Sequence, residues 1–279
     1  MSAQTADVDA DGFTRVAAKG RRNRSSKASS LSLKQTVPDS SIDTSSAGQG
    51  YATIPRKRLS KKYQQRSKTD VELQVEDVKV KLEVLRTGKF SQELQTCVDV
   101  VNLFGPEEIV CYGIGSLASQ VSQWQLALVL LINQYVGVDT CAFDPVTLAT
   151  DIETFHRFGI SMIAENEEAK RVATKRTLFF MPHCEQFLYD NVLAANWEPD
   201  QLARVLIIGN HLARYKDIQS GDEFAKNSPF ISRVLPHVTC TDLPSEKLLN
   251  LRHCPFAFTD TCLQQFRTNS ETIDRRHNS

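Results

Sequence analysis

The sequence predicts an α/β protein: a Rossmann-like, mostly parallel sheet with helices on both faces, preceded by a disordered basic N-terminal arm. Three observations predict this fold. Short, nearly continuous apolar runs alternate with segments of helical periodicity between residues 109 and 208. Such runs are typical of strands covered on both faces, and strict strand–helix alternation indicates parallel strands joined by right-handed crossovers. The first run opens into a Gly-x-Gly turn, and residues 1–70 differ in composition from the rest of the chain.

The N-terminal arm, residues 1–70, carries 14 Lys+Arg and 6 Asp+Glu, whereas the whole chain of 279 residues has 33 of each. The remainder is therefore acidic. Only nine residues of the arm are Leu, Ile, Val or Phe, too few to offset the entropy of folding, so we expect the arm to be disordered. Its basic clusters at 21–24 and 56–62 fit a nuclear-import signal, a nucleic-acid contact, a kinase-accessible tail or simply a solvated tail.

The hydropathy of the chain and its cysteine pattern predict a soluble protein of the cytosol or nucleus. No apolar signal segment follows Met1, and the longest apolar run, 126–132, is too short to cross a bilayer. Seven cysteines form no C-x-x-C pair, so we expect reduced thiols. We predict no metal site, because His183-Cys184 and His253-Cys254 are sequence neighbours, which is not metal-ligand spacing.

The predicted elements begin with two helices. Residues 71–85 fit either alternating strands or a helical stripe, and we favour a helix because the polar positions are mainly Glu, Lys and Gln. The second helix has Ser91 as its N-cap and ends at Gly105-Pro106. The two helices open a Rossmann-like domain that we place at residues 71–267, and we expect residues 268–279 to form a disordered tail.

The alternation follows. The expected strands are Ile109 to Ile114, Thr140 to Phe143, Ile160 to Ala164, Thr177 to Met181 and Val205 to Ile208, and the expected helices are Ser119 to Tyr135, Thr147 to Phe158, Asn166 to Ala173 and Cys184 to Ala195. Asn166 is the predicted N-cap of the third of these helices, with acidic residues in its first turn. The closing segment 256–266 supplies a candidate extra strand that packs on the sheet.

The turn after the first strand, Gly113-x-Gly115-x-x-Ala118, has the layout of a nucleotide-cradling turn. Its glycines allow a tight bend and a close approach to a phosphate or ribose. Asp144, which follows the next strand, offers a carboxylate to ribose hydroxyls. Two departures from the pattern are Ala118 in place of a third glycine and the longer spacing to the acid. The alternative is that the glycines only form a tight strand-to-helix corner.

In open parallel sheets, ligands bind outside the carboxyl ends of the strands. We therefore expect the residues at those ends to line one crevice: Gly113 to Ser116, Asp144, Glu165-Asn166, Pro182 to Cys184 and Gly209-Asn210. The cofactor-binding candidates are Gly113, Gly115, Ser116, Asp144 and Asn210, and a nucleotide-type ligand fits them best.

Two residues of this set are candidates for catalysis. His183 has an imidazole that titrates near neutral pH, so it is a candidate general base or positioning donor; the alternative is that it caps or packs on the following helix. Cys184 would begin that helix, where the helix N-terminus lowers a thiol's pKa, but no base for a thiol nucleophile is identifiable.

These residues carry a resemblance to the sensitivity-to-red-light-reduced family. The matching pieces lie within residues 75–266 and are CYGIGS, FDP, ENEEAKR, FFMPHC, NW, IIGN and FAFTDTCLQQF. The resemblance implies a regulatory protein: members are linked to light and circadian-clock input in plants, and animal relatives to clock-gene expression and haem biosynthesis. It implies no established reaction, and protein partners are expected.

Two other functions stay open. A nucleotide-dependent enzyme, of the S-adenosylmethionine or NAD type, would use Gly113, Gly115 and Asp144 for its cofactor, with His183 near the reacting centre. A protein-interaction module would keep the same residues around a vestigial pocket.

Overall fold

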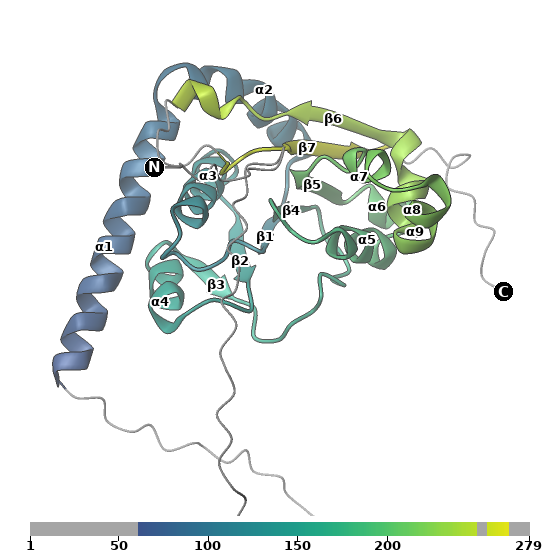
Figure 1. The fold of residues 1–279 in the computed structure, drawn as a ribbon. Helices are drawn as coiled ribbons and strands as arrows, with labels where there is room; N and C mark the ends of the chain where they lie inside the picture. Colours follow the sequence, from purple (N-terminus) through teal and green to yellow (C-terminus); the bar gives the residue numbers. More distant parts are fainter. Residues whose placement is uncertain (1–60, 250–255, 268–279) are drawn as a thin grey trace, which may run out of the picture. The chain divides into compact units, whose positions relative to one another are not determined.

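The computed structural model describes residues 61–249 and 256–267. They form a seven-stranded sheet in the order β3-β2-β1-β4-β5-β7-β6, flanked by helices (Figure 1). The predicted α/β, Rossmann-like class is confirmed. The strands are β1 (Glu108–Tyr112), β2 (Asp139–Phe143), β3 (Ile160–Met162), β4 (Thr177–Met181), β5 (Val205–Asn210), β6 (Val238–Asp242) and β7 (Thr261–Phe266).

The five strands predicted from the apolar runs are parallel to one another. The extra strand expected within 256–266 is β7, which lies between β5 and β6 and is antiparallel to both. The sequence analysis did not predict β6. Its residues are half-buried or exposed, as is usual at the edge of a sheet, so it lacks the continuous apolar run that marks a central strand.

Alternate residues of the central strands enter two hydrophobic cores, one on each face of the sheet. Ile109 and Phe180 lie in the first core, whereas their sequence neighbours Val110 and Phe179 lie in the second. Side chains of a strand point alternately to the two faces, so a strand covered on both sides must be apolar throughout. Each fully buried side chain of this size contributes about 1.5–3 kcal/mol relative to an exposed one.

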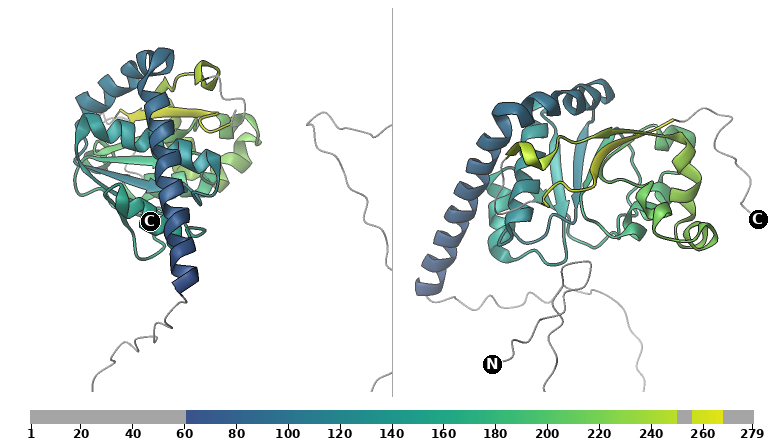
Figure 2. Two further views of the ribbon diagram at one scale, coloured as in Figure 1. Left: turned by 90° about the vertical axis from the view of Figure 1, so that its left-hand side faces the viewer. Right: turned by 45° about the horizontal axis from the view of Figure 1, so that its top comes forward.

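Four helices cover the first face: α1 (Lys61–Arg86), α2 (Gly88–Phe104), α3 (Gln120–Val136) and α4 (Ala149–Arg157). The long α1 runs along the outside of α3 and α4 (Figure 2). α2 ends at Gly105, as predicted, because this residue adopts the left-handed conformation at φ 61° and its N–H closes on Val101 O at 2.9 Å.

The second face is covered by α5 (Gln186–Ala195), which buries Tyr189, Val192 and Leu193, and by short segments that follow it. These are α6 (Pro199–Leu202), α7 (Arg214–Asp217), α8 (Gly221–Asn227), α9 (Pro229–Val234) and the 3-10 turn η1 (Leu235–His237). The 3-10 turn η2 (Glu246–Leu249) lies beside α2 on the first face. No helix among the residues described is long and apolar enough to cross a membrane.

The predicted helix at 166–173 is wrong: this segment is an irregular loop. Glu168 and Ala169 have φ values of 48° and 57°, which no right-handed helix contains. Asn166 accepts the Glu168 N–H at 2.9 Å and so serves a local turn instead of a helix. The buried Asn196 holds the end of the loop by accepting the Ala173 N–H at 2.7 Å.

Several boundaries also differ from the prediction, among them the ends of β1 at Tyr112 and of β3 at Met162, two residues earlier than expected. α1 begins at Lys61, inside the range expected to be disordered, because the residues there are mostly good helix formers and extend an established helix. The N-cap of α2 is Thr87 and not Ser91. The rest of the predicted arm, the predicted tail 268–279 and the pair His253-Cys254 lie outside the described residues.

Candidate functional site

The strand order places the candidate site between β1 and β4. From β1 the chain moves outward through β2 to β3, and it then returns to the other side of β1 to form β4 and β5. This reversal is the topological switch point of the sheet. In open α/β folds, ligands bind in the crevice outside the carboxyl ends of the strands at such a point. We call the residues gathered there the switch-point cluster: Gly113, Gly115, Asp144, His183, Cys184 and Asn210.

Gly113 and Cys184 meet at the centre of the cluster. Gly113 has φ 73°, and a Cβ atom added to it would lie 2.5 Å from the Cys184 sulfur. The thiol of Cys184 also contacts the carbonyl oxygen of Tyr112 at 3.3 Å. The glycine is therefore required for two reasons, its left-handed backbone and the close approach of the sulfur.

Gly115 and Asp144 form the second contact. The Gly115 N–H donates to the Asp144 carboxylate at 2.8 Å, and the other carboxylate oxygen accepts the Val146 N–H at 2.9 Å. A Cβ on Gly115 would lie 2.9 Å from Ser122 Oγ and would have to displace that hydroxyl, on a backbone that is already strained for other residues at φ 81°. The predicted ribose-binding acid thus fixes the glycine turn, and each of its oxygens keeps further acceptor capacity.

Ser116 lies next to these contacts. Its hydroxyl accepts the Ala118 N–H at 3.3 Å, in the turn that leads into α3. Asn166, at the end of β3, is occupied by its own loop, as described above. The structure therefore places the first, second, fourth and fifth strand ends in mutual contact and leaves the third outside this network of contacts.

Asn210 joins β5 to the turn after β4. Its side-chain oxygen accepts the His183 N–H at 2.7 Å, and its amide nitrogen donates to Cys184 O at 3.2 Å and to the Tyr215 hydroxyl at 2.9 Å. One acceptor and both donors of this side chain are in use, so the predicted ligand-binding residue acts here as a clamp on the His183-Cys184 turn.

His183 is exposed and has φ 58°, a conformation that costs a non-glycine residue about 1–2 kcal/mol. The Asn210 clamp holds it there. Its ring Nε2 lies 3.2 Å from Ala257 O, in the segment that leads into β7. Strained residues held in this way are concentrated at functional sites. An exposed imidazole on a fixed backbone can exchange a proton with a ligand or donate a hydrogen bond to it.

Cys184 does not have the reactive thiol that its position suggested. α5 begins at Gln186 with Glu185 as its N-cap, so Cys184 precedes the helix. Burial, followed by the negative charges of Asp144 and Glu185, raises the pKa of its thiol from 9.0 to about 12. The thiol is therefore protonated at neutral pH, and its geometry is that of a packing and hydrogen-bonding group.

The family described as the SRR1 domain matches residues 90–265. This chain belongs to the SRR1 domain family. The match includes the glycine turn, Asp144, the His183-Cys184 turn and Asn210, so the whole switch-point cluster lies within the family domain. The resemblance drawn from the sequence is confirmed.

Two curated relatives show the extent of the similarity. The SRR1 domain is 42% identical over 119 residues to Protein SENSITIVITY TO RED LIGHT REDUCED 1 of Arabidopsis thaliana, covering 41% of this chain and 43% of that protein. It is 38% identical over 130 residues to the SRR1-like protein of Mus musculus, covering 45% of this chain and 52% of that one. The alignments span about half the length of these relatives.

Among solved structures, the chain is similar to the SAH-bound methyltransferase PaMTH1 of Podospora anserina, with a TM-score of 0.39 and 12% identity. The similarity covers 78% of this chain and 99% of that one. A TM-score at this level supports no statement about activity.

Tyr189 was not identified from the sequence, although it stabilises the switch-point cluster of this SRR1 domain. Its hydroxyl donates to Met181 O and accepts the Asn210 N–H, so it joins the ends of β4 and β5. Its ring fills the space left by Gly209, where a Cβ would lie 2.7 Å from Tyr189 Cε1. The available signal was Gly209 itself, since a glycine inside a strand often marks the close approach of another group.

A second group of residues was also missed. His211, Cys240 and Cys262 lie close together beside β5, with their ligand atoms within 4.8 Å of one another. The sequence analysis predicted no metal site because it compared only neighbouring residues, whereas these three come from separate segments that sheet pairing brings together.

Proposed function

We propose that this SRR1-domain protein is a regulator in a light-dependent, circadian-clock input pathway. The observation that carries the proposal is the 42% identity to the Arabidopsis protein whose name records reduced sensitivity to red light. The similarity covers about half of that relative, so the role assigned here is that of the shared domain. A link to haem biosynthesis rests on the family resemblance alone.

The geometry of the switch-point cluster supports a binding role. The thiol of Cys184 is neutral and buried, which argues against nucleophilic catalysis by this residue. The exposed His183, held in a strained conformation by Asn210, presents the one imidazole of the cluster at its surface. We propose that a protein partner or a small nucleotide-like ligand contacts His183 there, in the cytosol or nucleus, and that the basic arm contributes nucleic-acid contacts.

A rescue experiment tests the regulatory proposal. Arabidopsis plants lacking the SENSITIVITY TO RED LIGHT REDUCED 1 relative are transformed with the full chain under that gene's promoter. The proposal predicts that red-light sensitivity and the period of the clock return toward wild type. A chain that accumulates to normal levels and restores neither would contradict the proposal.

The second candidate is a nucleotide-dependent enzyme of the S-adenosylmethionine or NAD type. The observation that favours it is the glycine turn itself, with two left-handed glycines, of which Gly115 donates its N–H to the Asp144 carboxylate at the end of the neighbouring strand. Asp144 retains acceptor capacity for a ribose hydroxyl. Under this reading His183 would lie near the reacting centre.

Thermal-shift measurements on the full chain test this candidate, with S-adenosylmethionine, S-adenosylhomocysteine, NAD, NADP and haem as probes. A bound ligand raises the melting temperature by mass action. Asp144→Asn keeps one oxygen as an acceptor and is the matched variant, because Asp144→Ala would release both Gly115 and Val146. A shift that Asp144→Asn removes supports the nucleotide reading. Absence of a shift with every probe favours the third reading, an interaction module with a vestigial pocket.

A further inference from the structure

Strand pairing places His211, Cys240 and Cys262 on one face of the sheet. Cys262 is paired with Gly209 of β5 and with Asp242 of β6. His211 follows Gly209 by two positions, and Cys240 precedes Asp242 by two positions. Because paired residues share a face and side chains alternate with a period of two, the three side chains point to the same side.

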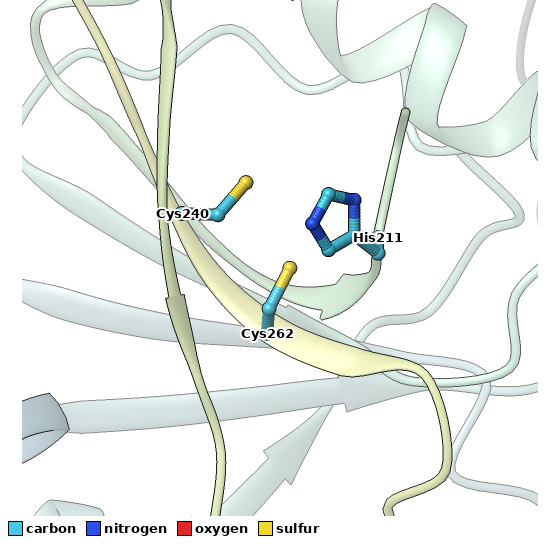
Figure 3. Close-up of side chains that lie close together, drawn as sticks. All are labelled: His211, Cys240 and Cys262. Carbon is cyan, nitrogen blue, oxygen red and sulfur yellow. The ribbon is translucent and has the colours of Figure 1, made fainter. Parts of the chain in front are cut away.

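The three side chains converge on one point beside the sheet (Figure 3). The sulfurs and one ring nitrogen all lie within 4.8 Å of one another. A tetrahedral zinc site, with zinc–sulfur bonds of about 2.3 Å and zinc–nitrogen bonds of about 2.0 Å, needs these atoms at roughly 3.5–3.8 Å.

Hydrogen bonds to the β7 segment hold the backbone around His211. The His211 N–H donates to Asp260 O at 2.8 Å. The buried side chain of Gln264 is hydrogen-bonded to the residues before and after His211. Its amide donates to Asn210 O at 3.1 Å, and its oxygen accepts the Leu212 N–H at 3.1 Å. The histidine is therefore fixed beside β7 independently of its own side chain, which is the preorganisation that a ligand residue needs.

The ring of His211 has an unused polar atom. Its Nδ1 is buried and has no hydrogen-bond partner among the described residues. An unpaired buried polar atom costs about 1–3 kcal/mol. The ring is turned toward the two sulfurs (Figure 3), although Nδ1 gains no hydrogen bond in this orientation. A cation bound at the other ring nitrogen would explain it.

The two cysteines differ in access. Cys262 is 1% exposed, whereas Cys240 is exposed at the edge of the sheet. A cation can therefore reach the cluster from the Cys240 side.

We propose that His211, Cys240 and Cys262 form a binding site for a borderline-soft divalent cation of the Zn²⁺ class. Three protein ligands leave the fourth tetrahedral position to water or to another ligand. On binding, each thiol gives up its proton to solvent, two zinc–sulfur bonds form, and no electrons are transferred. The site is separate from the switch-point cluster but adjoins it in sequence, because His211 directly follows Asn210.

Cobalt titration of the full-length chain, kept under a phosphine reductant and freed of metal, tests the proposal. We expect one Co²⁺ per chain, with thiolate-to-cobalt charge-transfer absorption and tetrahedral ligand-field bands that Zn²⁺ displaces. Cys240→Ser and His211→Asn each change an exposed or half-exposed side chain, so both should fold, and both should lose the charge-transfer band or weaken it strongly. Cys141→Ala, on β2 and separated from β7 by β1, β4 and β5, is the matched control and should retain the band.

Circular dichroism spectra of all variants check that they are folded. The proposal is overturned if the reduced wild-type chain shows no stoichiometric Co²⁺ or Zn²⁺ binding. If mass spectrometry of the unreduced protein then finds a Cys240–Cys262 disulfide, the two cysteines form a disulfide and not a metal site. The proposal is also overturned if Co²⁺ binding is as strong in both Cys240→Ser and His211→Asn as in the wild-type chain.

Discussion

The sulfur of Cys184 occupies the space that a side chain at Gly113 would need, with only 2.5 Å between that sulfur and a Cβ at residue 113. The two residues lie at the carboxyl ends of β1 and β4, the strands on either side of the switch point. This contact, together with the Gly115–Asp144 bond, closes the strand ends onto one another. The residues predicted to bind a ligand are therefore held in place by contacts with one another.

Gly113→Ala should destabilise the protein by about 2–4 kcal/mol, because an alanine at φ 73° is strained and its methyl group overlaps the sulfur. Cys184→Ala in the same chain should recover the steric part and leave the backbone strain. Urea unfolding of the two single variants and the double variant measures this coupling. Simple additivity of the two single effects would show that the contact is not the cause.

The buried thiol of Cys184 should make stability depend on pH in alkaline solution. Its pKa rises from 9.0 to about 12 on folding. Below pH 9 the thiol is protonated in both the folded and unfolded states, so it contributes no pH dependence. Between pH 9 and pH 12 only the unfolded chain ionises there, and stability falls.

Wild type should accordingly lose stability relative to Cys184→Ala as the pH rises from 9 to 11. Urea unfolding of both proteins at each pH gives the difference, in which the other titrating groups cancel. A difference in unfolding free energy that stays constant over this range would mean that Cys184 is not buried as a neutral thiol.

Asn210→Ala should cost about 1–3 kcal/mol, because it removes the partners of His183 N–H, Cys184 O and the Tyr215 hydroxyl. Asn210→Asp separates the two functions of the amide: it keeps the acceptor for His183 but places an oxygen against Cys184 O. We expect it to be nearly as destabilising. Chemical denaturation measures both, and an Asp variant as stable as wild type would rule out the donor half of the clamp.

The positive φ of His183 predicts an order of stability among its variants. His183→Gly should lie close to wild type, because relief of strain offsets the entropy that glycine loses on folding. His183→Val should be less stable than the glycine variant by about 1–2 kcal/mol, since a β-branched residue tolerates this conformation poorly. Melting temperatures of the two variants check the order, and the reverse order would contradict the backbone geometry.

Periodicity was enough to predict the parallel part of the sheet from the sequence, because its central strands β1, β4 and β5 are buried on both faces and nearly continuous in apolar residues. It failed for the 166–173 segment. That stretch has a good N-cap and favourable end charges, yet tertiary hydrogen bonds from Asn191 and Asn196 hold it as a loop. Local signals cannot report such distant partners.

The candidate site was predictable in part. Strand topology alone placed Gly113, Asp144 and His183 at neighbouring strand ends, but the partner of each group depended on side-chain geometry. Asp144 and Asn210 were expected to face a ligand, and both bind the backbone of adjacent turns. His211, Cys240 and Cys262 could be grouped only once the antiparallel insertion of β7 was known.

The role of the switch-point cluster is tested most directly by rescue of the Arabidopsis plants with His183→Asn, beside His156→Asn as an exposed histidine on α4 away from the cluster. Asparagine tolerates a positive φ, so His183→Asn should fold and accumulate normally while removing the imidazole. If the cluster contacts the ligand or partner through His183, this variant fails to restore red-light sensitivity and His156→Asn restores it fully. Full rescue by His183→Asn at wild-type protein levels would contradict that role.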